Sequence, residues 1–490
     1  MAETEQTDTT SAADHSEDKQ IRWILALTVA SVVLGAFVLL LAIGDEPYHI
    51  DELRQVRAYD LSTSAIIDAS FAQTQPPLDS LLNASAQGVI GVGDWQQRAL
   101  SVLFGIGSLV LFGLLSLRAG FGFGAPVAVA LLGLSPLLVS VTAYARPYAL
   151  PLLLILAFLL ASDVWIREGR KWTLPIVYAT AVLLPLSRTV EPPIVLASVA
   201  VVLLLRRYAV RRRPLGYSIW VPVSAALLGL VFVATPVALR LRREVTDFTE
   251  PNLVPSVDQL RRLVTELPGV LADAFPLWPV AAVVVIIAFF HPGSRRVIVE
   301  TWWFWVLTLV AIGFAVVFFA RVPIDQRYFI RYAFSFWPPF AFVAGALVST
   351  VVSSRSQKRT AWVGAALVAV VVVATTLALR TDLSTTLRAD WKAASETITA
   401  STSEDTTVIF DHVQPFGAYR TPFAGKPRYV DGERLIPLAL HLVPRPEWVD
   451  DTGPISVMLL EARPDVEGWI RSIAGGFAFY EPTKPLYGKE

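Results

Sequence analysis

The amino-acid sequence predicts an all-α polytopic membrane bundle of about eleven transmembrane helices, with a large outer first loop and a small C-terminal α/β outer domain. Hydrophobic residues make up 54% of the 490 positions and charged residues only 17%, whereas a soluble protein carries about 25% charged residues. Apolar runs long enough to cross about 30 Å of hydrocarbon recur along the chain. A long polar loop follows the first run, and a polar tail follows the last.

The composition argues against several functional classes. The formal net charge is zero, so no bulk electrostatic attraction favours nucleic acid as a partner. Cysteine is absent, which excludes disulfides, cysteine-ligated zinc and thiol catalysis. The five histidines are scattered and form no HExxH-like pair, so a metal site built from histidines is not expected.

The N-terminal part contains a polar tail and a first span. Residues 1–20 are rich in Thr, Glu and Asp, and we predict that they form a disordered cytoplasmic tail. Residues 23–43 are an unbroken apolar run that is too long for the hydrophobic core of a signal peptide, so we interpret it as a retained anchor. It opens a transmembrane domain predicted over residues 21–380.

The outer first loop, residues 44–97, is predicted to lie along the membrane surface. Apolar residues recur there at near-helical spacing, at Ile50, Leu53, Val56 and Tyr59, with Asp51, Glu52 and Gln55 elsewhere on the helical wheel. This pattern indicates a short surface helix. Residues 78–92 are apolar but short for a full span, so we expect them along or dipping into the interface.

The remaining spans are predicted at residues 98–117, 125–141, 148–166, 172–187, 190–206, 217–238, 273–290, 300–320, 329–352 and 361–379. If the N-terminus is cytoplasmic, the inner loops hold most of the loop Lys and Arg residues, among them Arg167, Arg170 and Lys171. The positive-inside rule therefore favours a multi-pass protein of the plasma membrane with this orientation.

The same orientation places the loop 44–97 and the tail 381–490 on the outer face. Residues 390–400 have the composition of a helix, whereas residues 406–410 and 455–460 have the apolar, β-branched character of buried strands. The tail is therefore predicted to be a small extracytoplasmic α/β domain.

Asp51 and Glu52 form an acidic pair just beyond the first span. Two adjacent carboxylates at the edge of a bilayer are costly unless they are solvated, paired or used in function. One interpretation is a chemical centre at Asp51. The other is a solvated pair in the first turn of the surface helix, where the helix dipole favours negative charge.

Several arginines occupy the outer ends of predicted spans in aromatic settings. They are Arg146 in Tyr144-Ala145-Arg146-Pro147-Tyr148, Arg188 after Leu186-Ser187, and both Arg327 and Arg331 in Arg327-Tyr328-Phe329-Ile330-Arg331-Tyr332. Arginine is always charged, and its planar fork of donors suits phosphate. We predict that these arginines bind a phosphate at headgroup level. The alternative is that each one snorkels to the interface.

An ordered set of motifs resembles a known family. In chain order it comprises Asp51-Glu52, Gln75-Pro76-Pro77-Leu78, Gln97-Arg98, Ser135-Pro136, Ala145-Arg146-Pro147-Tyr148, Arg327-Tyr328 and Asp390-Trp391-Lys392. This order resembles the polytopic C-type glycosyltransferases, in the branch of protein O-mannosyltransferases and lipid A aminoarabinose transferases. The resemblance covers most of residues 20–395 and rests on the ordered set, because no single motif is specific.

The resemblance implies a membrane glycosyltransferase of the outer face. Such an enzyme moves a sugar, mannose or another pentose or hexose, from a polyprenyl-phosphate donor to a hydroxyl of an acceptor protein, glycan or glycolipid. The family role of general base, or of positioning the acceptor, carries over to Asp51, and less firmly to Glu52. A hydroxyl nucleophile needs a carboxylate within hydrogen-bond reach, and direct displacement would invert the anomeric centre.

Two other functions and one cofactor stay open at this point. A transporter or flippase of lipid-linked glycans would show polar or broken segments in matching halves, and no such repeat is visible. A non-catalytic assembly factor would not need Asp51. A divalent cation beside the acidic pair is compatible with the sequence, although two carboxylates alone do not make a site, because hard cations prefer six or more oxygen ligands.

Overall fold

The computed structural model describes residues 6–43, 61–72, 76–91, 94–188, 191–209, 219–233, 278–321 and 337–353, together with a few single helical positions and five strands between 407 and 482. The chain divides into two compact units. The first comprises Met1–Ile43, Ser62–Asn83 and Arg98–Ser384, and the second Gly44–Leu61, Ala84–Gln97 and Thr385–Glu490.

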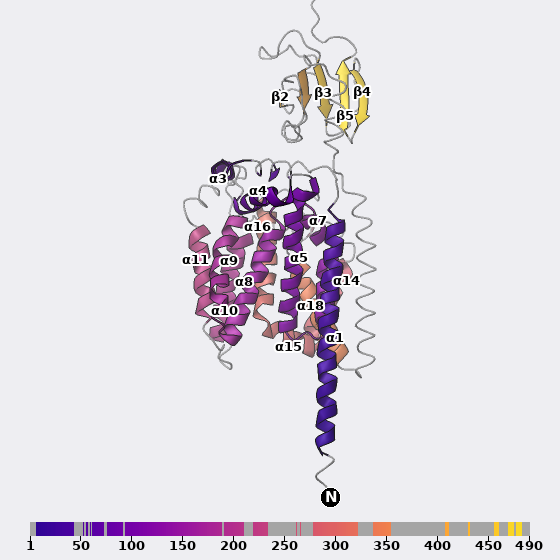
Figure 1. The fold of residues 1–490 in the computed structure, drawn as a ribbon, viewed down its shortest axis with the longest axis vertical. Coiled ribbons are helices and arrows are strands. Elements are labelled where there is room, and N and C mark those ends of the chain that lie inside the picture. Colours follow the sequence, from indigo (N-terminus) through magenta and orange to yellow (C-terminus); the bar gives the residue numbers. More distant parts are fainter. Residues whose placement is uncertain are drawn as a thin grey trace, which may run out of the picture. The chain divides into compact units, whose positions relative to one another are not determined.

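The first unit is a bundle of apolar helices (Figure 1). The elements are α1 (Gln6–Leu41), α3 (Thr63–Ala72), α4 (Leu78–Ile90), α5 (Asp94–Arg118), α6 (Gly124–Gly133), α7 (Pro136–Thr142), α8 (Ala149–Glu168), α9 (Thr173–Ser187), α10 (Glu191–Ala209), α11 (Trp220–Val233), α14 (Trp278–Phe290), α15 (Pro292–Glu300), α16 (Trp302–Arg321) and α18 (Trp337–Ser353). The helices α4 and α5 begin or end in the second unit.

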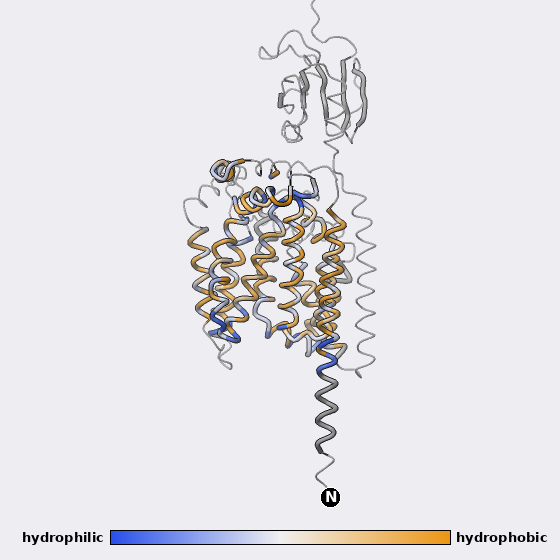
Figure 2. Tube along the Cα trace, viewed as in Figure 1, coloured by the Kyte–Doolittle hydropathy of each residue, from blue (hydrophilic) through white to orange (hydrophobic). Residues whose placement is uncertain are grey.

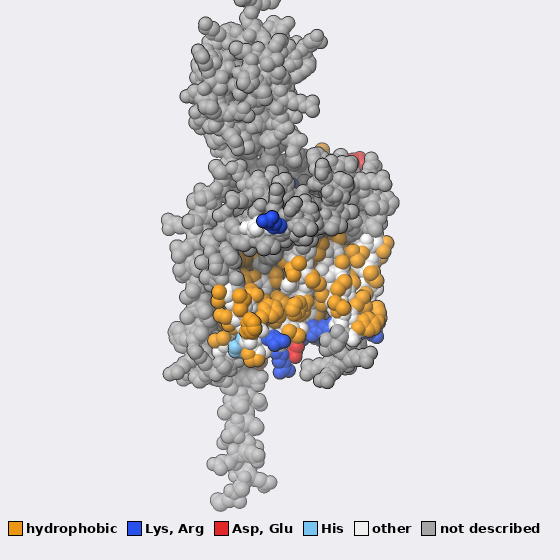
Figure 3. Space-filling model, turned by 180° about the vertical axis from the view of Figure 1, so that it is seen from behind, with side chains coloured by type: hydrophobic (Ala, Val, Ile, Leu, Met, Phe, Trp, Pro, Cys, Tyr) orange, Lys and Arg blue, Asp and Glu red, His pale blue; other side chains and the backbone are white. Residues whose placement is uncertain are grey.

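These helices have the surface of a membrane protein. They are hydrophobic over most of their length, with hydrophilic residues towards their ends (Figure 2). Hydrophobic side chains form a broad band on the face shown in Figure 3, and Lys, Arg and acidic side chains gather along one edge of the band. Large apolar side chains such as Val33, Leu114 and Val231 point out of the bundle, as they do where lipid surrounds a protein. The chain is therefore a multi-pass membrane protein.

Three described helices are long and apolar enough to cross a membrane, namely Asp18–Leu41, Trp95–Arg118 and Ala149–Glu168. A fourth span exists if Pro292–Glu300 and Trp302–Gly313, which meet at a bend of 83°, count as one. Shorter apolar helices occupy four more of the predicted spans. The span predicted at residues 361–379 lies outside the described residues, so the total of about eleven stays a prediction.

The segment predicted as one span over residues 125–141 is not one continuous helix. The structure divides this segment into α6 and α7, with a break at Leu134 and Ser135. Ser135 has an extended backbone and its hydroxyl accepts a hydrogen bond from the N–H of Leu138 at 3.3 Å. Pro136, which lacks an N–H, begins the new helix, and a residue before proline is disfavoured in the helical region.

Two further segments differ from the sequence-based prediction. Helix α1 begins at Gln6, so much of the tail predicted to be disordered is helical. Once the apolar span has nucleated a helix, each added residue costs little, and polar residues can extend it. A separate helix, α15, lies in the connection where the sequence predicted only a loop between spans.

Helix α6 packs between α1 and α18 because glycines let the backbones approach closely. A Cβ atom added to Gly35 of α1 would lie 3.1 Å from the Cα of Gly133 in α6. At the other crossing, a Cβ on Gly124 of α6 would overlap the carbonyl oxygen of Gly345 in α18. Small residues are the usual means of close helix packing in a membrane, where lipid competes for every apolar surface. All ten residues of α6 are buried.

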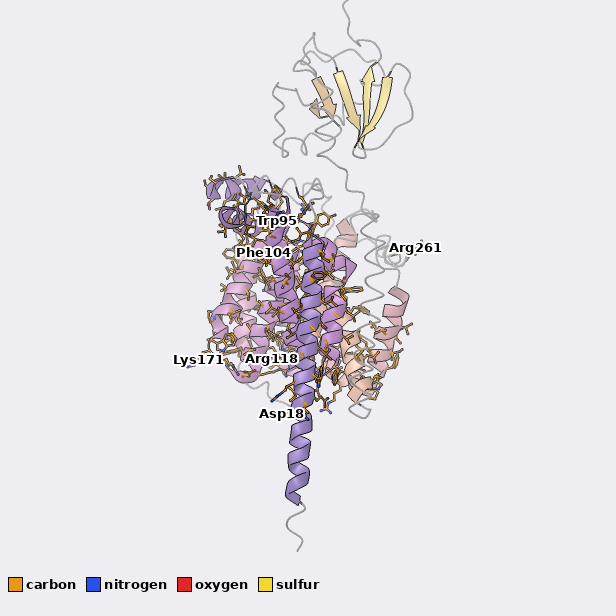
Figure 4. The ribbon with its side chains drawn as sticks, turned by 45° about the vertical axis from the view of Figure 1, so that its right-hand side comes forward. Asp18, Trp95, Phe104, Arg118, Lys171 and Arg261 are labelled. Atoms are coloured by element: carbon orange, nitrogen blue, oxygen red, sulfur yellow. The ribbon has the colours of Figure 1, made fainter. Side chains whose placement is uncertain are left out.

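A buried carboxylate joins three helices near the C-terminal end of α8. Asp163 of α8 is fully buried, and its oxygens accept hydrogen bonds from Arg118 Nε of α5 and Arg167 Nε, both at 3.0 Å. The indole N–H of Trp302, at the start of α16, also donates to Asp163 at 3.1 Å. Arg118 and Lys171 lie at the same end of the bundle as Asp18 of α1 (Figure 4).

The second unit contains a five-stranded sheet in the order β2-β1-β3-β5-β4. Its strands are β1 (Thr407–Phe410), β2 (Val430–Asp431), β3 (Ile455–Leu459), β4 (Trp469–Ala474) and β5 (Phe477–Pro482). Strand β1 pairs in parallel with β2 and β3, whereas β5 pairs antiparallel with β3 and β4. The strands expected at 406–410 and 455–460 coincide with β1 and β3, respectively. The helix expected at 390–400 lies outside the described residues.

Candidate active site

Two of the four predicted phosphate-binding arginines meet on one aromatic ring. Arg146 and Tyr148 lie in the short connection between α7 and α8, and Arg188 directly follows α9. Helices α8 and α9 pack against each other and are joined by a short turn at residues 169–172. The start of α8 and the end of α9 therefore lie at the same end of the bundle, which brings residues 148 and 188 together.

The contacts around Tyr148 are close. The Cζ atom of Arg188 lies 4.5 Å from the centroid of the Tyr148 ring, and that of Arg146 lies 5.8 Å from it. Nη1 of Arg146 also donates a hydrogen bond to the Tyr148 hydroxyl at 3.3 Å. Each cation is attracted to the negative face of an aromatic ring. Because two positive charges share one ring, an anion bound beside them would relieve their mutual repulsion.

Backbone geometry holds the connection that carries Arg146. The N–H of Arg146 donates to the Tyr144 carbonyl at 2.8 Å, and the N–H of Tyr148 donates to the Arg146 carbonyl at 2.7 Å. The hydroxyl of Ser101, in α5, donates to the same Arg146 carbonyl at 3.3 Å. The arginine therefore sits on a tight, hydrogen-bonded turn fixed to a neighbouring helix.

The arginine cluster lies at the opposite end of α8 from Asp163 and Glu168. Helix α8 has 20 residues, which corresponds to about 30 Å, the thickness of a bilayer core. The arginine cluster and the group around Asp163 and Glu168 thus lie towards opposite ends of a helix that is about as long as the bilayer core is thick. This separation places the arginine cluster at the interface opposite the end that holds Arg118 and Lys171.

Glu191 is a part of this cluster that the sequence analysis missed. It is the first residue of α10, its side chain is 3% exposed, and its Oε1 atom lies 2.6 Å from Nη1 of Arg188. A signal was present in the sequence, since Glu191 is an ionisable residue inside the span predicted at 190–206, and such residues mark functional sites.

Two more charged residues near this end are buried more deeply than the sequence indicated. Arg98 in α5 and Asp79 in α4 are both fully buried. Asn83 donates to the carbonyl of Asp79 at 3.0 Å. Burying a charge is costly unless it is paired and hydrogen-bonded. Arg98 had entered the sequence analysis only as part of a motif.

The predicted acidic pair is described only in part. Asp51 lies outside the described residues, as do Arg327 and Arg331. Glu52 is helical and fully buried, and Gln55, Val56 and Tyr59, at helical spacing from it, are buried as well. The expectation that Glu52 and Gln55 point away from the apolar residues is wrong, because all four share one buried helix face. The solvated alternative for Glu52 is therefore excluded.

No metal centre is evident in the part of the chain that the structure describes. No group of three or more His, Asp or Glu side chains is close enough there to hold an ion. The donors gathered around Tyr148 are guanidinium groups, which bind anions and repel cations.

The chain has the fold of ArnT, in line with the resemblance found in the sequence. Among solved structures, it is similar to ArnT from Cupriavidus metallidurans bound to undecaprenyl phosphate, with a TM-score of 0.52 and 15% identity over 94% of this chain and 99% of that chain. The apo state of the same ArnT gives a TM-score of 0.50 over the same shares of the two chains.

A third solved structure is more distant. It is the oligosaccharyltransferase of Archaeoglobus fulgidus tethered to an acceptor peptide, with a TM-score of 0.46 and 11% identity over 80% of this chain and 62% of that chain. No family model matches the sequence, and none of the curated proteins matches it.

Proposed function

We propose that this protein is a membrane glycosyltransferase that moves a sugar from a polyprenyl-phosphate donor to an acceptor hydroxyl on the outer face of the membrane, with inversion at the anomeric carbon. The observation that carries the proposal is the pair Arg146 and Arg188 on the ring of Tyr148, in a chain with the fold of ArnT. The similar ArnT structure holds undecaprenyl phosphate, which supports a lipid phosphate as the carrier.

The arginine cluster would bind the phosphate of the donor. As the bond between the anomeric carbon and the phosphate oxygen breaks, its electron pair stays on that oxygen and negative charge grows there. Fixed guanidinium groups stabilise such a developing charge without having to reorganise. Arg146 and Arg188 are suited to this task because a hydrogen-bonded turn and an aromatic ring already hold them in place. Arg327 and Arg331 stay candidates for the same role.

The acidic pair would activate the acceptor. As the acceptor oxygen attacks the anomeric carbon from the side opposite the phosphate, its proton passes to a carboxylate, which we assign to Asp51. Glu52 is a second candidate, because a fully buried carboxylate is costly to keep unless it has a task. General base catalysis of this kind contributes a factor of about a hundred or more in rate.

The distribution of charge supports the outer face of the membrane as the side of the reaction. Arg118, Arg167 and Lys171 lie at the far end of α8 from the arginine cluster. Because basic residues accumulate on the cytoplasmic side, the cluster would face outward. Mannose, or another pentose or hexose, is the proposed sugar, and a protein, glycan or glycolipid is the proposed acceptor.

The experiment is a transfer assay in membrane vesicles with radiolabelled undecaprenyl-phosphate mannose and undecaprenyl-phosphate arabinose in parallel. We expect a labelled acceptor with one donor, and a loss of at least about a hundredfold in Asp51→Asn. The matched control is Asp68→Asn, an exposed carboxylate in the same outer loop, which should keep full activity. Translocation of labelled lipid across sealed vesicles, with no transfer product, would instead establish a flippase and refute the proposal.

A further inference from the structure

Glu191 has a buried carboxylate whose hydrogen-bonding capacity is not fully used. The side chain is 3% exposed. The guanidinium of Arg188 and the backbone N–H of Glu191 itself approach it. Within the described part of the chain, however, neither oxygen accepts a hydrogen bond of normal geometry.

This arrangement is costly if nothing else binds there. A carboxylate has two oxygens that together accept about four hydrogen bonds. An ion pair with Arg188 offsets part of the cost of burial, and the position at the start of α10 adds a small favourable contribution from the helix dipole. A buried acceptor without donors still carries a large desolvation cost. Groups that donate hydrogen bonds to Glu191 would remove that cost.

The position of Glu191 indicates which donors these are. Arg188 contacts both the ring of Tyr148 and the carboxylate of Glu191. If the lipid phosphate binds Arg188 and Arg146, Glu191 is a direct neighbour of a residue that holds the phosphate. In a sugar phosphate, the groups next to the phosphate are the hydroxyls of the sugar ring, which are hydrogen-bond donors.

We propose that Glu191 accepts hydrogen bonds from hydroxyl groups of the donor sugar, so that Arg188 and Glu191 together recognise the junction between sugar and phosphate. Glu191 is then a specificity-determining residue that distinguishes the loaded carrier from the bare lipid phosphate. This inference rests on the proposed function, because it needs a sugar on the phosphate that the arginines hold.

A different role for Glu191 has a different consequence. If the carboxylate only holds Arg188 against Tyr148, its loss would change the binding of the loaded carrier and of the bare carrier by the same factor. If it contacts the sugar, only the loaded carrier loses a contact. Removing its negative charge would leave the bare phosphate bound as tightly as before, or more tightly, because Glu191 no longer competes for Arg188.

The test compares two ligands in lipid nanodiscs by equilibrium competition. The ligands are undecaprenyl phosphate and undecaprenyl-phosphate mannose, with undecaprenyl-phosphate arabinose in place of the mannose lipid if that is the donor that supports transfer. The variants are Glu191→Gln, which keeps the shape of the side chain, and Glu300→Gln. Glu300 is an exposed glutamate that also pairs with an arginine, Arg296 at 3.1 Å, and serves as the control.

We expect the preference of the wild type for the loaded carrier to fall about tenfold or more in Glu191→Gln, since hydrogen bonds to a charged group have at least this effect. The preference should not change in Glu300→Gln. An unchanged preference in Glu191→Gln, or an equal loss for both ligands, would overturn the inference. Arg188→Lys tests the underlying proposal separately, because it should weaken both ligands. If it weakens neither, the phosphate site itself is wrongly assigned.

Discussion

The guanidinium of Arg188 lies 4.5 Å from the centroid of the Tyr148 ring and 2.6 Å from the carboxylate of Glu191. These contacts join the end of α9, the start of α8 and the start of α10. The arginine is therefore held between an aromatic face and an acid, with 12% of its side chain exposed. A side chain held in this way has lost most of its freedom before any ligand arrives, which lowers the entropic cost of binding.

The ring of Tyr148 should matter more than its hydroxyl. Tyr148→Leu removes the surface on which both guanidinium groups rest, whereas Tyr148→Phe removes only the hydrogen bond from Arg146 at 3.3 Å. Each cation–π contact contributes about 0.5 to 2 kcal/mol. We therefore expect Tyr148→Leu to weaken the binding of undecaprenyl phosphate at least about fivefold, and Tyr148→Phe to have a clearly smaller effect. Equal losses in the two variants would show that the hydroxyl is the important group.

Loss of the buried carboxylate of Asp163 should lower the stability of the protein but leave the phosphate-binding site unaffected. Asp163→Ala removes the shared acceptor of Arg118, Arg167 and Trp302. The buried indole N–H of Trp302 would then lack this acceptor, and leaving a buried donor unsatisfied costs about 1–3 kcal/mol. The two arginines, which are 26% and 46% exposed, would lose their shared partner as well. We expect a markedly lower temperature of unfolding in detergent, measured by intrinsic fluorescence.

The control for Asp163→Ala is Glu300→Gln, which breaks an exposed ion pair and should change stability by less than about 1 kcal/mol. Because Asp163 lies at the far end of α8 from Tyr148, the fraction of Asp163→Ala that stays folded should bind undecaprenyl phosphate normally. Weaker binding by the folded fraction would mean that the two ends of the helix are coupled.

The close crossing of α6 and α18 should not tolerate a methyl group. Gly124→Ala places a Cβ where the carbonyl oxygen of Gly345 already lies, and a backbone atom cannot move aside as a flexible side chain can. We expect the helices to separate and the protein to lose about 1–3 kcal/mol of stability, as overpacked cores do. The measurement is the midpoint of thermal unfolding.

Gly88→Ala is the matched substitution for Gly124→Ala. Gly88 is also a helical glycine, in α4, but a Cβ there would meet no atom within 4 Å. Since alanine favours helices over glycine by about 1 kcal/mol, this variant should be as stable as the wild type or slightly more so. Equal destabilisation by both substitutions would refute the packing argument.

The sequence was sufficient to predict the class of fold because hydrophobicity and segment length determine it. Apolar runs of membrane length predict the bundle, and the arginines beside aromatic residues predict the cluster at Tyr148. The break at Ser135 was missed because the apolar run continues through it, although Pro136 marked it. The buried positions of Glu191, Arg98 and Glu52 could not be predicted, since which helix face is buried depends on neighbouring elements distant in the sequence.

Glu52 provides a direct test of the division of work within the acidic pair. Its carboxylate is fully buried and shares one helix face with Gln55, Val56 and Tyr59. Glu52→Gln keeps the shape of the side chain and removes the charge. If Asp51 is the base and Glu52 supports it, we expect transfer to fall less than about a hundredfold, the usual lower limit for loss of a general base, with the sensitivity to pH unchanged.

The measurement is the rate of sugar transfer in membrane vesicles between pH 5 and pH 8, a range that we choose as roughly that in which a working general base titrates. Wild type, Asp51→Asn and Glu52→Gln are compared, with Asp68→Asn as the exposed control. A base that must be deprotonated gives a rate that rises with pH and then levels off. If the rise persists in Asp51→Asn and disappears in Glu52→Gln, the buried glutamate is the base, and the assignment of Asp51 is wrong.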